Sequence, residues 1–334
     1  MAQLILFLQQ LLNGLSLGSI YALIALGYTM VYGVLRFINF AHGDVYMLGA
    51  YAGFAITNLI YTLCPLDQFN AISRHTFIPI FVSTAIVMLG AMIFCAVIGV
   101  LIERLAYRPL RDRPRLTVLI TAIGVSLFLQ NMTQFFVGAQ PQAFKQLIPV
   151  RAIEGLGDLT VLSSQAAIIL STIVLMVLLR LIVMKTKLGL AMRALSVNPT
   201  ACSLMGVNNG LVISFTFALG SALAAAAGIL VAMDSPSINP LMGNLPGIKA
   251  FVAAVLGGIG NITGAVVGGL IIGVLETLVV GGFANPILDW FPALRYFFPQ
   301  GFSQFRDAIA FGVLIVILLF KPTGIFGRVE REKV

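Results

Sequence analysis

Three polar side chains interrupt the apolar N-terminal part of this sequence and could take part in recognising a polar solute. Asn39, His42 and Asp44 stand between two apolar runs that are each long enough for a membrane-spanning helix. His42 and Asp44 are two residues apart, so they do not share one helical face. We expect a break in a helix beside a solute pathway, where these groups could meet a zwitterion. The alternative is a boundary His and Asp that are satisfied by nearby backbone. For Asn39 the alternative is a hydrogen bond between helices, with a role in packing.

Glu276 is a sharper candidate because it stands alone in an apolar run. Its neighbours on both sides are valine, leucine and threonine. An ionisable group inside a membrane span is costly, and by default it indicates function. We expect Glu276 either to lie on the pathway or to be a structural partner across a dimer interface. The candidates for the translocation pathway are therefore Asn39, His42, Asp44 and Glu276.

The loop from Lys185 to Asn209 connects two apolar runs and has internal structure. Its basic residues and its lack of acids are typical of the cytoplasmic side of a membrane. Asn198 before Pro199 predicts a helix start, because Asn caps free N–H groups and Pro loses nothing at the first helical position. Gly206 can end that helix after about two turns, since glycine tolerates positive φ. Such a loop is shaped to be held by a partner, and the alternative is an ordinary connector.

The sequence lacks the motifs of common enzymatic and nucleotide-binding sites. It contains no G-x-x-x-x-G-K-[ST], no G-x-S-x-G and no H-E-x-x-H, and His42 and His75 cannot form a metal-binding pair. Cys64, Cys95 and Cys202 show no metal-ligand spacing. We therefore expect a component of a transport system that is not an enzyme and binds no cofactor itself. Such a protein either uses an ion gradient or depends on a separate ATPase.

Composition indicates a membrane protein. Of the 334 residues, 59% are hydrophobic and only 10% are charged, whereas soluble domains carry roughly 25% charged residues. Continuous apolar runs of 18 or more residues predict an all-α polytopic membrane protein. The net charge of +8 lies in short loops and the C-terminal tail, which fits orientation in the lipid bilayer rather than binding of nucleic acid. Residues 1–334 are expected to form one transmembrane domain.

The apolar runs predict about eight to nine membrane segments, including broken or re-entrant helices. Residues 4–35 are long for one span and short for two, so the side of the N-terminus stays open. The run 248–280 is crowded with glycine, and Asn261 to Gly264 predicts a break between two shorter helices. Further spans are expected at about 45–63, 77–102, 116–137, 165–184, 211–232 and 304–320.

Two patterns predict how these spans pack and how they are oriented. Gly260, Gly264 and Gly268 are four residues apart, so we expect them on one helical face where backbones approach closely. The Arg-rich segment 103–115 and the charged tail 321–334 are expected in the cytoplasm. We expect the charges near Glu103 to set orientation and to contact an ATPase rather than the solute.

Several motifs give the chain an end-to-end resemblance to a known family. The most specific is Asn39-Phe-Ala-His-Gly-Asp44, and Thr200-Ala-Cys-Ser-Leu-Met-Gly206 lies in the cytoplasmic loop. Glu103 to Pro109, Ala253 to Gly260 and Lys321 to Arg328 also match. The chain resembles the LivH-type permease subunit of bacterial ATP-binding-cassette importers for branched-chain amino acids. Permeases for urea and amides share the N-terminal motif.

The resemblance implies a permease that moves branched-chain or other neutral amino acids across the bacterial inner membrane. It implies a homologous second permease (LivM type), two ATPase subunits that use the ATP, and a periplasmic amino-acid-binding protein. The short helix at 199–205 would lie in a cleft of an ATPase subunit and transmit its closure to the spans. The residues expected to couple to the ATPase are Arg193, Asn198, Pro199, Ala201 and Gly206.

The chain departs from the family pattern in two places. Coupling loops of such permeases often contain Glu-Ala-Ala-x-x-x-Gly. Ala201 and Gly206 fit this pattern here, but Thr200 and Cys202 stand where the Glu and the second Ala would be. The segments around 64–76 and 283–300 look longer than in the family, and we assign them no function.

Two other functions stay open from the sequence. One is the same machinery carrying urea or short amides, since apolar spans do not distinguish solutes. The other is a gradient-driven secondary transporter or a channel acting alone, a class that often shows an inverted repeat and midplane carboxylates. Glu276 is the one clear candidate for such a carboxylate, and no repeat is obvious. The helix after Asn198 favours a partner-driven permease, because a lone carrier has no need for it.

Overall fold

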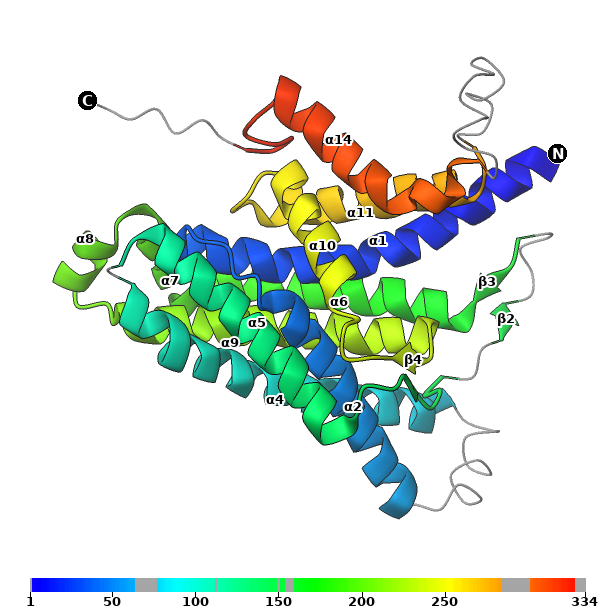
Figure 1. Ribbon diagram of the computed structural model, residues 1–334, viewed down its shortest axis with the longest axis horizontal. Coiled ribbons are helices and arrows are strands. Elements are labelled where there is room, and N and C mark those ends of the chain that lie inside the picture. The colour runs from blue at the N-terminus through cyan, green and yellow to red at the C-terminus, as the bar shows by residue number, and fades with distance from the viewer. Residues whose placement is uncertain are drawn as a thin grey trace.

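A computed structural model of the protein describes residues 2–63, 77–111, 113–148, 151–153, 159–283 and 301–327. Helices make up most of this part of the chain (Figure 1), which confirms the expected all-α polytopic class. The segment 64–76, most of 283–300 and residues 328–334 of the tail lie outside the described residues. The predictions made for those segments therefore stay predictions.

Within the described ranges, six helices are long and apolar enough to cross a bilayer. Five of them are α1 (Ala2–Leu35), α5 (Arg115–Val137), α6 (Ser163–Lys185), α9 (Asn209–Asp234) and α11 (Ile262–Val280). The sixth begins as α4 (Phe77–Ile102) and continues through the π-helical η1 (Glu103–Tyr107) and the 3-10 turn η2 (Arg108–Leu110). Further apolar helices are α2 (His42–Leu63), α10 (Asn244–Gly257) and α14 (Arg306–Phe320), which follows the 3-10 turn η3 (Phe302–Phe305).

The N-terminal apolar run forms one uninterrupted helix. α1 has 34 residues, which is about 51 Å at 1.5 Å per residue. Gly14 and Gly18 do not break it, because they are the places where α11 crosses. A Cβ on Gly18 would clash with the backbone of Leu270, and one on Gly14 would clash with Val274. Glycine at these two positions therefore lets the two backbones approach closely.

The glycine-rich stretch forms a hairpin of a short helix and a longer one. α10 ends at Gly257, and residues 258–261 turn the chain into α11. Asn261 Oδ1 accepts a hydrogen bond from Gly264 N at 3.2 Å and so caps α11. The predicted break in this stretch is confirmed.

The three glycines that we expected on one face do not all lie in a helix. Gly260 lies in the turn with φ of 92°. The prediction that it shares a helical face with Gly264 and Gly268 is therefore wrong. The chain reverses direction there, and only glycine adopts such a φ readily. Gly264 and Gly268 lie in α11 and face α10, where a Cβ would clash with Gly257 and Ala253.

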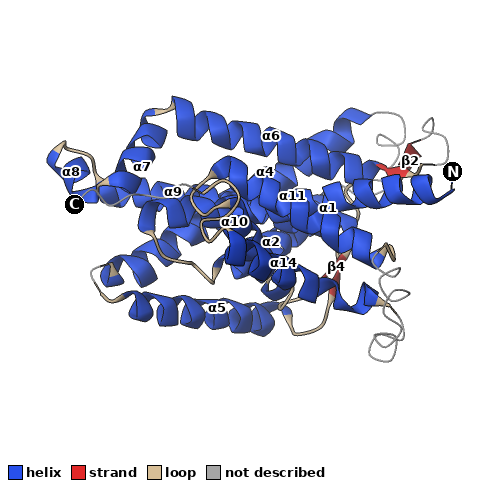
Figure 2. Ribbon diagram, turned by 90° about the horizontal axis from the view of Figure 1, so that it is seen from above, coloured by secondary structure: helices blue, strands red, loops and turns tan. Residues whose placement is uncertain are grey.

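α1 and α9 form the centre of the bundle. Every residue from Ile20 to Leu26 of α1 is buried, and α9 is buried on most sides. A helix that is apolar all round is expected in such a position. Helices α4, α5 and α6 bury much less of their surface. In Figure 2, α6 and α5 run along opposite edges of the molecule, so their outward faces are available to lipid or to a partner chain.

The two ends of the bundle carry different structures (Figure 1). One end holds two short antiparallel pairs, β1 (Gln142–Ala143) with β4 (Ser237–Ile238) and β2 (Ala152–Ile153) with β3 (Val161–Leu162). The opposite end holds α7 (Lys187–Val197) and α8 (Pro199–Leu204). The loop that we expected to meet a partner therefore stands at one end of the molecule.

Candidate functional site

The loop 185–209, which we call the coupling loop, is helical over most of its length. Asn198 Oδ1 accepts a hydrogen bond from Ala201 N at 3.0 Å, and Pro199 stands in the first turn of α8. Gly206 follows the helix with φ of 82°. The predicted start and end of the short helix are confirmed. The helix ends one residue earlier than the expected range 199–205, because Met205 already leaves the helical pattern.

Polar contacts fix α8 in place while its apolar end stays in solvent. Asn209 Nδ2 donates to Pro199 O at 2.9 Å and to Ser203 Oγ at 3.2 Å. Leu204 and Met205 are 84% and 83% exposed. Large apolar side chains held outward on a fixed helix mark a surface for a partner. The sequence analysis missed this pair, although an apolar pair just before Gly206 was a signal for it.

The break between α1 and α2 is fastened to η1. Arg36 has φ of 55°, a left-handed conformation that ends α1. Asn39 Oδ1 accepts hydrogen bonds from Ala41 N at 3.1 Å and from the Tyr107 hydroxyl at 2.6 Å. Asn39 is buried. It therefore joins two helices in this structure.

The first turn of α2 contributes to a cluster that we call the central polar cluster, consisting of Asp44, Gln130 and Asn244. Gln130 Nε2 of α5 donates to Asp44 Oδ1 and to Asn244 Oδ1, both at 2.8 Å. Asp44 and Gln130 are buried, whereas Asn244 is exposed at the start of α10. Backbone glycines Gly43 and Gly243 let α2 and the start of α10 meet here. The cluster therefore connects a buried carboxylate with the surface.

His42 lies two residues before Asp44 in the sequence, but its side chain faces α1. Its ring makes an edge contact with Tyr28, with 4.7 Å between the ring centroids. Its Nε2 lies against Gly27, is buried, and has no hydrogen-bond partner among the described residues. His42 and Asp44 thus point at different helices, as their two-residue spacing predicts.

Glu276 belongs to a second cluster, which we call the ion cluster: Lys249, Glu276, Arg306 and Asp307. Lys249 Nζ lies 2.7 Å from Glu276 Oε1 and 2.5 Å from Asp307 Oδ1, the latter as an ion pair without hydrogen-bond geometry. The Tyr21 hydroxyl donates to Glu276 Oε2 at 3.0 Å, and Arg306 Nε lies 3.6 Å from Oε1. Glu276 therefore has its partners within this chain, from α1, α10 and α14.

The structure does not bring all four pathway candidates together. Asn39, His42 and Asp44 gather at the start of α2, but Glu276 has different hydrogen-bond and ion-pair partners. α10 reaches both groups, because Asn244 and Lys249 are five residues apart on it. Five residues correspond to about 7.5 Å along the helix axis.

The sequence analysis missed Lys249, although a signal for it was present. Lys249 is a lysine within the apolar run 248–280, so the argument that singled out Glu276 applies equally to it. Opposite charges in neighbouring spans would then have suggested the pair. Gln130 and Asn244 offered a weaker signal, because Gln130 is an uncharged amide within α5 and Asn244 stands at the start of α10, where Asn is common.

Glu103 is placed differently from our expectation. It is fully buried, it accepts a hydrogen bond from the Ser214 hydroxyl at 2.6 Å, and it pairs with Arg111. A buried carboxylate cannot contact an ATPase subunit, so that expectation is wrong for Glu103. Arg104 and Arg108 at the same segment are exposed. The reason is that η1 turns Glu103 inward against α9 while its neighbours face solvent.

Membrane spans, polar clusters buried among them and an exposed helical loop at one end are together typical of membrane transport proteins. The family described as branched-chain amino acid transport system / permease component matches residues 10–318. The chain belongs to this family.

Individual relatives cover the chain almost completely. It is 42% identical to the high-affinity branched-chain amino acid transport system permease protein BraD of Pseudomonas aeruginosa, over 98% of each chain. It is 41% identical to LivH of Salmonella typhimurium and 39% identical to LivH of Escherichia coli, in each case over 99% of both chains. No solved structure gives a significant match.

Proposed function

We propose that this chain is the membrane-spanning permease subunit of an ATP-binding-cassette importer that carries branched-chain amino acids across the bacterial inner membrane. The observation that carries the proposal is the exposed apolar end of α8, fixed by Asn198 and Asn209, on a chain whose relatives are named as permeases of such systems. The sequence contains no P-loop. In this proposal, separate ATPase subunits supply the energy, because the chain itself has no motif for binding ATP.

The coupling loop would be the part of this chain on which the conformational change of an ATPase subunit acts. Asn198 and Gly206 define the ends of α8, Pro199 begins it, and Leu204 and Met205 supply the contact surface. Because Thr186 is the only residue between α6 and α7, movement of the loop is passed directly to a membrane span. Arg193 belongs to α7, which lies between α6 and α8 in the chain.

The central polar cluster is the part of the chain best suited to meet the solute. Asn244 is exposed and leads through Gln130 to the buried Asp44, so an ammonium group could interact with the amide oxygens and then with the carboxylate. Leu245 and Ile248 of α10 are 54% and 42% exposed beside it and would contact an aliphatic side chain. The exposed face of α10 would pair with the second permease.

The complete importer would contain a homologous second permease of the LivM type, two ATPase subunits and a periplasmic amino-acid-binding protein. The basic residues of the coupling loop support a cytoplasmic location for its end of the bundle. Phe326 and Gly327 line one cavity with Arg193 and Ser196 of α7. This supports a C-terminal tail on the same, cytoplasmic side.

Uptake in proteoliposomes tests the proposal. The vesicles would contain this chain, the second permease and the ATPases, with ATP inside and binding protein and radiolabelled leucine outside. Leu204→Glu places a charge on the exposed end of α8 and should abolish co-purification of the ATPases and ATP-dependent uptake. Leu241→Glu is the matched control, since Leu241 is also exposed but lies just before α10, far from α8. It should retain ATPase binding.

Three results would overturn the proposal. Uptake by this chain alone without ATP would favour a gradient-driven carrier or channel. ATP-dependent uptake of urea or a short amide but not of leucine would keep the machinery and change the solute. ATPase binding that survives Leu204→Glu would remove α8 as the contact.

A further inference from the structure

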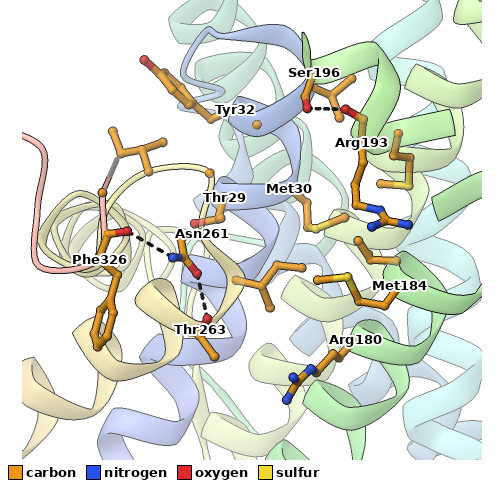
Figure 3. A pocket seen from close by; sticks show the side chains of 18 of the residues that line it. Thr29, Met30, Tyr32, Arg180, Met184, Arg193, Ser196, Asn261, Thr263 and Phe326 are labelled. Atoms are coloured by element: carbon orange, nitrogen blue, oxygen red, sulfur yellow. Dashed lines mark hydrogen bonds between the residues drawn. The ribbon is translucent and has the colours of Figure 1, made fainter. Parts of the chain in front are cut away.

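A cavity of about 740 Å³ opens at the same end of the bundle as the coupling loop (Figure 3). Its walls come from the ends of α1 and α6, from α7, from the turn between α10 and α11, and from residues 326–327. Binding sites for organic molecules commonly have volumes of about 300–1,000 Å³. The cavity is therefore large enough for more than a simple ion.

The cavity is positively charged. Arg36, Arg180 and Arg193 line it, and no acidic residue is found among the described residues that do so. Figure 3 shows the Arg180 and Arg193 side chains, which line the cavity and extend from two different helices. The amide of Asn261 is already used, because it donates to Phe326 O at 3.2 Å and accepts from the Thr263 hydroxyl at 2.8 Å. Arg36 Nη2 likewise already donates to Ser196 O at 3.3 Å. The guanidinium groups of Arg180 and Arg193 are thus the groups that would select a ligand, and they select an anion.

The cavity also borders an apolar surface. Arg180 lies within the span of α6, five residues before its end at Lys185. On the same helix Val177, Leu181 and Met184 are about half exposed, and Met184 also lines the cavity. A small soluble anion would use only the arginines. A ligand with an anionic head and an apolar tail would use both surfaces.

We infer that this cavity binds the headgroup of an anionic phospholipid, with its phosphate between Arg180 and Arg193 and its acyl chains along the exposed face of α6. Basic pockets between spans on the cytoplasmic side are suited to such headgroups. The ligand would join α6 to α7, the helix that leads into α8. A bound lipid would therefore hold the coupling loop in position relative to the spans, whichever solute the protein carries.

Lipid binding to the purified importer complex tests the inference. The delipidated complex would be titrated with phosphatidylglycerol or phosphatidylcholine and examined by native mass spectrometry. Arg180→Gln with Arg193→Gln should weaken binding of phosphatidylglycerol about twenty-five-fold, since each basic side chain near an anionic lipid contributes roughly fivefold. Arg180→Gln alone should weaken binding of phosphatidylglycerol roughly fivefold. Binding of phosphatidylcholine should not change.

The control is Arg104→Gln with Arg113→Gln, which removes two exposed arginines that do not line the cavity. It should bind phosphatidylglycerol as the unmodified complex does. Equal loss in control and test variants would overturn the inference, because general surface charge would explain it. Displacement of the lipid by millimolar inorganic phosphate would indicate a free-anion site instead. Cross-linking of Arg180→Cys to a partner subunit in the assembled complex would indicate a protein interface.

Discussion

Glu103 and Glu276 are both buried, but their surroundings differ in a way that separates two uses of a membrane carboxylate. Glu103 pairs with Arg111, eight residues away, whose side chain is 23% exposed. Glu276 pairs with Lys249, whose side chain is only 5% exposed, and with groups from α1 and α14. Glu103 thus connects the charged end of α4 to one other helix, α9, whereas Glu276 contacts residues of three other helices, α1, α10 and α14.

The difference matters when one partner is lost. A buried ion pair contributes little net stability compared with apolar groups, but the removal of one partner leaves an uncompensated buried charge. Arg111 can reach water if Glu103 is removed. Lys249 and Glu276 cannot reach water in this structure. The two clusters should therefore respond to substitution by different amounts.

The largest effect is expected for Lys249→Met. It leaves Glu276 and Asp307 as neighbouring carboxylates with only Arg306 close by, so we expect a loss of about 3–5 kcal/mol in stability. The measurement is the shift in the unfolding curve of the assembled complex in SDS, followed by circular dichroism. Lys249→Met with Glu276→Leu removes both buried charges and should recover at least half of the loss. A double variant that is no better than the single one would contradict the uncompensated-charge account.

Glu103→Gln should have a smaller effect, about 1–2 kcal/mol in the same unfolding measurement. The Gln side chain can still accept the hydrogen bond from Ser214, and Arg111 can turn to solvent. Arg104→Gln, an exposed charge beside it, is the matched control and should be neutral. If Glu103→Gln lowers the stability of the complex as much as Lys249→Met does, the exposure of the partner side chain does not explain a difference between the two glutamates.

The smallest effects are expected from the hydroxyl donors of the two glutamates. Tyr21→Phe removes the donor to Glu276, and Ser214→Ala removes the donor to Glu103, with about 1 kcal/mol lost in each case. Tyr46→Phe is the control, because the buried Tyr46 hydroxyl has no hydrogen-bond partner among the described residues. Its removal should not destabilise the complex. A larger loss for Tyr46→Phe than for Tyr21→Phe would refute the assignment of these contacts.

Local sequence patterns predicted much of the fold. Hydropathy located the spans to within a few residues, and the residue types at Asn198, Pro199 and Gly206 predicted α8 because capping depends on neighbours in the chain. The break near Asn261 followed from the same kind of signal. These features depend on interactions over only a few residues.

Long-range pairings were not predictable in this way. Whether Gly14 and Gly18 would break α1 or accept α11 depends on a helix more than 250 residues later. The ion cluster likewise combines Tyr21 with residues from α10, α11 and α14. Asn244 had the appearance of an ordinary loop residue until α10 was placed against Gln130. Apart from opposite charges such as Lys249 and Glu276, a single sequence gives little indication of which spans are neighbours.

The shortness of α10 has a mechanical consequence. Its 14 residues form a helix of about 21 Å. This helix is hydrogen-bonded to other elements at three points along its length. Asn244 is held by Gln130, Lys249 is held by Glu276, and the carbonyls of Leu256 and Gly257 accept hydrogen bonds from Ile325 N and Phe326 N. Because α10 is a short helix, an axial shift of one of its ends also shifts the other end. Movement of the segment around Phe326 would therefore be expected to shift Asn244, which is linked to the carboxylate of Asp44 through Gln130.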